Sequence, residues 1–165
     1  MQRGLWVTVE EAKEDLWKKM QEPNGAVCPC CDRFAKVYKR KLNRTMARGL
    51  IWLYRQRCRQ GGVFIDTANL APREMVRTNQ WPTCRWWGLI ESQPNEDDPS
   101  KKESGMWRLT DLGVDFIEGR ILVPSHCYHY NGNTIAHSDT QTTIEESLGK
   151  PFHYREMMDE SGVEA

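Results

Sequence analysis

The sequence lacks the features that identify membrane proteins, secreted proteins and the common types of enzyme. No window approaches the roughly 18 consecutive apolar residues that a membrane span requires. The first 17 residues are acidic and amphipathic, unlike a signal peptide. A Gly-rich phosphate loop, an HExxH pair, a nucleophile elbow and a paired-carboxylate signature are all missing. We therefore expect a non-enzymatic, cytoplasmic protein with a single hydrophobic core and extensions.

The chain also lacks net charge, because 23 basic side chains balance 23 acidic ones, but these charges are unevenly distributed. Residues 33–88 carry a net charge of +11, whereas residues 1–32 carry −2 and residues 89–165 carry −9. A basic block of this kind is typical of proteins that bind nucleic acid. An acidic tail that folds back and neutralises the block is the alternative interpretation.

Hydrophobic periodicity and capping residues predict an α+β fold. Thr8 and Asn43 stand where helices should begin, and the Gly61-Gly62 pair should end the second helix. Helices are expected near residues 9–21, 44–60, 72–78, 82–88, 111–118, 140–148 and 153–160, and strands near 63–65, 89–91, 106–109, 121–130 and 134–136. These elements predict that the chain has three parts. They are an N-terminal helix and Cys-rich knuckle with a basic run (1–42), a central domain (43–119), and a C-terminal hairpin with short helices (120–165).

The central part has the element order of a winged helix, which is a helix-turn-helix followed by a β-hairpin. Its sequence resembles the MarR-type winged-helix family over residues 43–119. In that family the recognition helix ends in a Leu-x-x-x-Gly-Leu-Ile phrase, and the return strand of the wing carries an aromatic residue, Leu-Thr and Gly. The matching positions here, with Cys in place of the first Leu, are Cys84, Gly88, Leu89, Ile90, Trp107, Leu109, Thr110 and Gly113. The whole chain also resembles small phage- or prophage-encoded proteins of unassigned function.

A recognition helix in the major groove would bind base edges through its exposed side chains. Thr83 and Arg85 should face outward there, with Arg77 and Asn79 in the preceding turn, whereas Cys84 and Trp87 should face the core. The cations expected to contact phosphates are Lys36, Lys39, Arg40, Lys41, Arg44 and Arg48. The wing itself is acidic, with Glu96, Asp97, Asp98 and Glu103 against two lysines, which disfavours its entry into a minor groove.

Six cysteines without a secretory signal indicate reduced thiols rather than disulfides. Cys28 and Cys31 have the spacing of half a zinc site, and Cys127 with His129 would complete a structural Cys₃His site. Cys30 and His126 are spare ligands. Two alternatives stay open: the cysteines are small buried hydrophobes, or Cys28 is the nucleophile of a CPxC thiol oxidoreductase. Cys58 and Cys84 are expected in the core.

The favoured hypothesis is a phage-encoded winged-helix protein that binds double-stranded DNA and contains a structural zinc ion. The first helix could supply a homodimer interface, and the host cytoplasm would be its location. The second hypothesis is a protein-interaction module, such as a phage factor that binds a host protein, because winged helices also serve that purpose. The acidic wing and the tryptophan pair at residues 86–87 favour this alternative.

Overall fold

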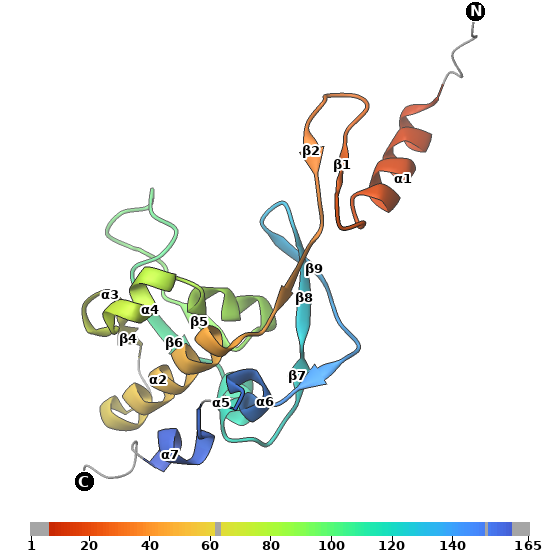
Figure 1. Cartoon of the computed structure of the whole chain (residues 1–165). Coiled ribbons are helices and arrows are strands. Elements are labelled where there is room, and N and C mark those ends of the chain that lie inside the picture. Colours follow the sequence, from red (N-terminus) through yellow and green to blue (C-terminus); the bar gives the residue numbers. More distant parts are fainter. Residues whose placement is uncertain (1–6, 62–63, 151, 160–165) are drawn as a thin grey trace, which may run out of the picture. The chain divides into compact units, whose positions relative to one another are not determined.

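The computed structural model describes residues 7–61, 64–150 and 152–159 and has an α+β fold with small antiparallel sheets (Figure 1). The chain divides into two compact units. The first contains the residues up to Arg40 together with Tyr128–His137, and the second contains Lys41–Cys127 and the residues from Ser138 onward. The C-terminal hairpin, which the sequence grouped with the short helices, thus belongs largely to the first unit.

The first unit contains one helix and two small sheets. Its elements are α1 (Val9–Lys19), β1 (Ala26–Val27), β2 (Phe34–Ala35), β3 (Tyr38–Lys41), β8 (His126–Tyr130) and β9 (Asn133–His137). The last residue of β3 and the first two residues of β8 are counted with the second unit. β1 pairs with β2, and the second sheet has the order β3-β8-β9. The predicted capping box is present, since Thr8 and Glu11 cap each other's backbone N–H groups.

The core of the first unit is small. Its buried residues are Met20, Ala35 and Val37, and the partly buried side chains packed against them are Leu16, Tyr128 and Tyr130. Such a core buries little apolar surface, so few contacts hold this unit together.

The second unit contains most of the helices and two sheets. Its helices are α2 (Arg44–Gln60), α3 (Thr67–Leu70), α4 (Arg73–Thr78), the 3-10 helix η1 (Trp81–Trp87), α5 (Asp111–Ile117), α6 (Ile144–Leu148) and α7 (Tyr154–Asp159). Its strands are β4 (Ile65–Asp66), β5 (Ile90–Ser92), β6 (Met106–Leu109), β7 (Val123–Pro124) and β10 (Gln141–Thr142). The sheets have the orders β4-β6-β5 and β10-β7.

Helix α2 is the centre of the second unit and confirms the sequence prediction. The Asn43 side chain accepts a hydrogen bond from the backbone N–H of Met46, and Gly61 ends the helix with a φ of 84° in the left-handed region. The residues on its buried face recur at helical spacing: Met46, Ala47, Leu50, Ile51 and Leu53. Burial of each larger side chain contributes about 1.5–3 kcal/mol to folding.

Two close contacts fix the elements around α2. A Cβ atom at Gly49 would lie 2.5 Å from the Cβ of Trp81, so this glycine lets η1 approach the helix. Trp81 in turn packs edge-on against Trp107 of β6, with ring centroids 5.2 Å apart. Gly113 of α5 similarly lies against the carbonyl oxygen of Leu89, which a larger residue would overlap. These contacts position η1 and the β5–β6 hairpin on the core.

The structure differs from the sequence predictions in several elements. The helix expected at 82–88 is a 3-10 helix, and the segments expected as single elements at 121–130 and 140–148 each contain a short strand before the main element. The short strands β1, β2 and β3 and the helix α3 were not predicted. Cys84 is buried as expected, but the prediction for Cys58 is wrong because this residue is exposed near the end of α2. The expected strand at 63–65 is observed as β4, and Val63 lies outside the described residues. No helix in the described ranges is both long and apolar enough to cross a bilayer.

Candidate nucleic-acid interface

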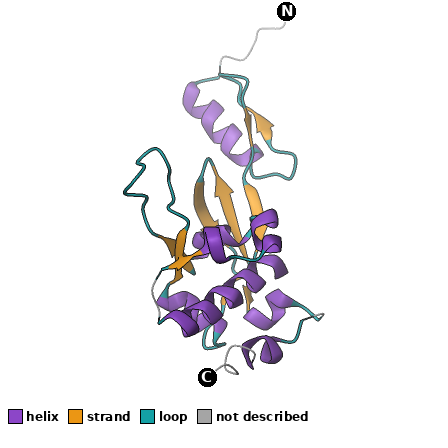
Figure 2. Cartoon of the chain, turned by 90° about the vertical axis from the view of Figure 1, so that its left-hand side faces the viewer, coloured by secondary structure: helices purple, strands orange, loops and turns teal. Residues whose placement is uncertain are grey.

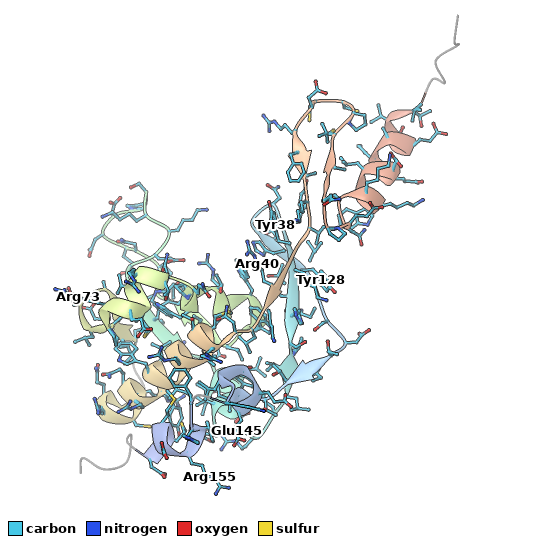
Figure 3. The ribbon with its side chains drawn as sticks, viewed as in Figure 1. Tyr38, Arg40, Arg73, Tyr128, Glu145 and Arg155 are labelled. Carbon is cyan, nitrogen blue, oxygen red and sulfur yellow. The ribbon has the colours of Figure 1, made fainter. Side chains whose placement is uncertain are left out.

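The predicted phosphate contacts divide between the two units. Lys36, Lys39 and Arg40 belong to the first unit, and all residues of β3 are exposed. Lys36 Nζ lies 5.5 Å and Arg40 Cζ lies 5.2 Å from the ring centroid of Tyr38, and Lys39 Nζ lies 5.9 Å from that of Tyr128 (Figure 3). Sequence reasoning found these cations but missed the tyrosines. The alternation of Lys36, Tyr38 and Arg40 along one face of an extended segment was the available signal.

Arg44 and Arg48, by contrast, have structural contacts within the second unit. Arg44 Nε donates to the carbonyl oxygen of Leu148 at 2.9 Å, and its guanidinium lies 5.6 Å from the ring of Phe152. Arg48 forms a two-pronged ion pair with Glu74, with one N–O distance of 3.0 Å, and lies 4.7 Å from the same ring. These contacts hold α6, Phe152 and α4 near α2, and both arginines are less available for phosphate contacts than the sequence indicated.

The turn between α4 and η1 has the geometry of a tight helix-to-helix connection. Asn79 has a φ of 44°, in the left-handed region that Asn tolerates well, and its N–H donates to the carbonyl oxygen of Met75 at 3.1 Å. Gln80 accepts a hydrogen bond from the Asn43 side chain at 2.8 Å. The turn is thereby tied to the beginning of α2.

The cations of α4 face solvent. Arg73 and Arg77 are both exposed, and no ion pair within the described ranges involves either of them. Arg73, which Figure 3 labels on α4, was not among the residues singled out from the sequence. Its position one helical turn before Arg77 was the signal that could have identified it.

The recognition segment η1 presents its predicted residues only in part. Cys84 and Trp87 are buried, as expected. Thr83 is half-buried and its hydroxyl donates to the carbonyl oxygen of Gln80 at 2.5 Å. Arg85 is exposed but forms an ion pair with Glu103, a residue 18 positions further along the chain. Arg85, one of the side chains expected to bind base edges, therefore has a carboxylate partner in the free protein.

The loop between β5 and β6 is long (Figure 2), and its sequence is acidic. Asp98 accepts hydrogen bonds from the hydroxyl and the backbone N–H of Ser100, at 2.5 and 3.1 Å, and these bonds hold the pKa of its carboxyl below the usual range. Lys101 lies 3.7 Å from the same carboxylate. The loop thus carries fixed negative charge beside the recognition segment, which would repel phosphates.

The cysteine cluster forms a tight turn between β1 and β2. Cys28 N–H donates to Arg33 at 2.8 Å, and Asp32 N–H donates to Cys28 at 3.0 Å. The backbone N–H groups of Cys30 and Cys31 hold the pKa of the Cys28 thiol below its usual range. Cys28 is half-buried, and Cys30 and Cys31 are exposed.

The other predicted zinc ligands lie on β8. Cys127 is fully buried in the core of the second unit, and His129 belongs to the first unit. No group of three or more His, Cys, Asp or Glu side chains in the described part of the chain is arranged to hold a metal ion. His126 is half-buried, and its Nδ1 lies 2.8 Å from the Ser125 hydroxyl. The four-ligand zinc site stays a prediction from the sequence.

Comparison of the chain with protein-family models, with curated proteins and with solved structures finds no match. The resemblance to the MarR-type family is therefore carried by the sequence phrases alone.

Proposed function

We propose that this chain is a non-enzymatic protein that binds double-stranded DNA and whose second unit is a winged helix. The observation that carries the proposal is the order of elements, α2, β4, α3 and α4, η1, β5 and β6, combined with the sheet order β4-β6-β5. A helix-turn-helix whose hairpin returns to pair with the strand after the first helix is the arrangement of a winged helix. The tight turn at Asn79 supports the same assignment.

In this proposal α4 crosses the DNA backbone, as the first helix of a helix-turn-helix does. Arg73 and Arg77 would contact phosphates, because both are exposed on α4. Lys36, Lys39, Arg40 and Lys41 would add phosphate contacts of their own. Such contacts give affinity without sequence preference.

Base recognition would depend on Arg85 and Thr83 of η1. Breaking an exposed ion pair such as that between Arg85 and Glu103 costs about 0.2–1 kcal/mol, whereas a good two-pronged contact between Arg and guanine contributes about 1–3 kcal/mol. The exchange is therefore favourable at a guanine and unfavourable elsewhere. This makes Arg85 a source of specificity rather than of general affinity.

A salt-dependent binding assay with a fluorescein-labelled duplex of mixed sequence tests this proposal. Between 50 and 200 mM salt the logarithm of the association constant should fall with a slope of about −0.9 per phosphate contacted. Arg73→Ala and Arg77→Ala should each reduce the magnitude of that slope by about 0.9. Arg155→Ala is the matched control, since Arg155 is exposed on α7 (Figure 3) and should leave the slope unchanged. Absence of binding at 50 mM salt, or a slope that all three variants change equally, would overturn the proposal.

A second candidate function is protein interaction, favoured by the acidic loop and by the carboxylate on Arg85. The loop would then bind a basic surface of a partner protein. In this case duplex DNA would not bind, and a stoichiometric protein complex would dissociate when Glu96 and Asp97, both exposed in the loop, are changed to Gln and Asn.

A further inference from the structure

We propose that the face formed by the half-buried Lys36 and the exposed Tyr38 and Arg40 is a stacking site for unpaired bases of a single-stranded nucleic acid. The inference rests on the proposed function for its ligand class, which is nucleic acid. It adds that this unit binds the nucleic acid in single-stranded form, and it names Tyr38 as the side chain that contacts the bases. It concerns the first unit only, and the winged-helix assignment of the second unit is not part of its argument.

The first observation is an exposed aromatic ring between two cations. Tyr38 is 43% exposed on β3, a strand of which every residue faces solvent. Lys36 and Arg40 stand two positions before and after it, so all three side chains lie on one face of the chain. The cations lie 5.5 and 5.2 Å from its ring centroid.

These cation contacts are weak enough for a base to replace. A cation–π contact at an exposed site contributes about 0.5–1 kcal/mol, whereas a base stacked on an aromatic side chain contributes about 1–3 kcal/mol. A base arriving at Tyr38 can therefore displace Lys36 or Arg40 from the ring. The displaced cation then lies next to the phosphates that flank the base, where it gains an ion pair.

The second observation is a second ring beside a hollow of about 570 Å³. Tyr128 of β8, the neighbouring strand, lines this hollow together with Tyr38, Pro23 and Lys39. The volume lies within the range of about 300–1,000 Å³ typical of small-ligand sites. Figure 3 shows Tyr38 and Tyr128 on adjacent strands, and both residues line the hollow.

The third observation is the sign of the charge. Within the first unit, the strands of the β3-β8-β9 sheet contain Lys39 and Arg40 and no Asp or Glu. Glu22 is the one carboxylate that lines the hollow, against Lys36 and Lys39. This charge complements a phosphate backbone. A duplex would satisfy the cations but not the rings, because its bases are stacked on one another.

The test measures binding of the full chain to a fluorescein-labelled dT oligonucleotide by fluorescence anisotropy at 50 mM salt. Tyr38→Ala should weaken binding by about 5- to 100-fold, the range that the loss of one stacked base gives. Tyr38→Phe retains the aromatic face and should stay within about twofold of the wild type. Tyr38→Leu retains apolar bulk without an aromatic face and should behave like Tyr38→Ala.

Two further variants separate stacking from charge and from exposed aromatics in general. Trp17→Ala is the matched control, because Trp17 is 48% exposed on α1 of the same unit and should not affect binding. Lys36→Ala should reduce the magnitude of the salt slope by about 0.7, the value for one phosphate of a single strand. Circular dichroism of each variant confirms that it is folded.

The outcomes separate this inference from the proposed function. Unchanged dT binding by Tyr38→Ala and Tyr38→Leu overturns the inference, as does binding of duplex but not of dT, and neither result affects the winged-helix proposal. Binding of dT that requires Tyr38, without binding of duplex, supports the inference and overturns duplex docking. Polyglutamate is a polyanion without bases and serves as a control for charge alone. If it binds as tightly as dT and its binding is insensitive to Tyr38→Ala, the stacking inference is overturned. Absence of binding to both oligonucleotides overturns both proposals.

Discussion

Under the proposed DNA-binding function, replacement of Glu103 by Gln is expected to strengthen binding to duplex DNA by releasing Arg85. Glu103, in the loop between β5 and β6, pairs with Arg85 of η1, and the two side chains are 34% and 48% exposed. Gln has nearly the same shape and can still accept a hydrogen bond, so the loop should keep its conformation. Only the negative charge is removed.

Two contributions set the size of the effect. Arg85 no longer has to leave an exposed ion pair, which saves about 0.2–1 kcal/mol on binding. A carboxylate at about 10 Å from a phosphate repels it by roughly 0.4 kcal/mol in water before screening by salt. Together they predict a gain of about 0.6–1.4 kcal/mol before screening by salt, equivalent to roughly three- to tenfold tighter binding. The free energy of unfolding should fall by less than about 1 kcal/mol.

Anisotropy titration of the labelled duplex at 50 mM salt measures this gain, and urea unfolding measures the cost in stability. The matched control is Glu91→Gln, which removes the carboxylate from the Arg108–Glu91 pair on the same hairpin. The exposures of that pair, 46% and 45%, are similar. An equal gain in both variants would show a general effect of charge, and a gain that keeps its full size when Arg85 is also replaced by Ala would refute the role assigned to Arg85.

Three further predictions concern the fold and the cysteines. Gly113→Ala should lower the free energy of unfolding by about 2 kcal/mol and the Tm by about 4–8 °C. Overlap of the new methyl group with the Leu89 carbonyl costs about 3 kcal/mol, and the better helix propensity of Ala offsets about 1 kcal/mol of that cost. Tyr54→Phe should cost about 1 kcal/mol, since the Tyr54 hydroxyl donates to Glu118 at 2.6 Å. That bond raises the pKa of Tyr54, so the wild-type advantage should be full below about pH 10 and be lost at higher pH, as the phenol ionises in the folded state. A Cys₃His site requires one zinc per chain by elemental analysis, and loss of that zinc in Cys31→Ser.

Each of these predictions has a clear contrary result. Leu112→Ala, at an exposed position of α5, should change stability far less than Gly113→Ala, and equal losses would contradict the close contact with Leu89. A stability difference between wild type and Tyr54→Phe that does not vary with pH would contradict the role of the phenol. Purified protein free of zinc would contradict the metal site.

Local sequence signals predict an element correctly where the residues that begin, pack and end it all lie within that element or next to it. Helix α2 begins after Asn43 and ends before Gly61 as predicted, because the cap, the apolar period and the stop signal are all local. The residues of η1 predict a helix but not its kind, because a seven-residue segment with Pro near its start is compatible with either a 3-10 or an α-helix.

The candidate site depended more on contacts between distant residues, which the sequence does not specify. The pairing of Arg85 with Glu103 across 18 residues changed the expected role of a base-reading side chain. Arg44 was expected on DNA and instead holds a carbonyl group 104 residues away. The Lys36, Tyr38 and Arg40 alternation, by contrast, is local and could have been recognised.

The two hydrogen bonds of the Asn43 side chain limit which residues can replace it without loss of a contact. Its side-chain oxygen caps α2, and its amide nitrogen donates to Gln80 in the turn before η1. Asp, Ser and Thr also cap helices well, but none has an acceptor and an N–H donor on separate atoms. A drift from Asn to Asp would thus preserve the helix while releasing the turn. A single substitution at position 43 could therefore leave the protein folded while it alters the turn on which the proposed DNA recognition depends.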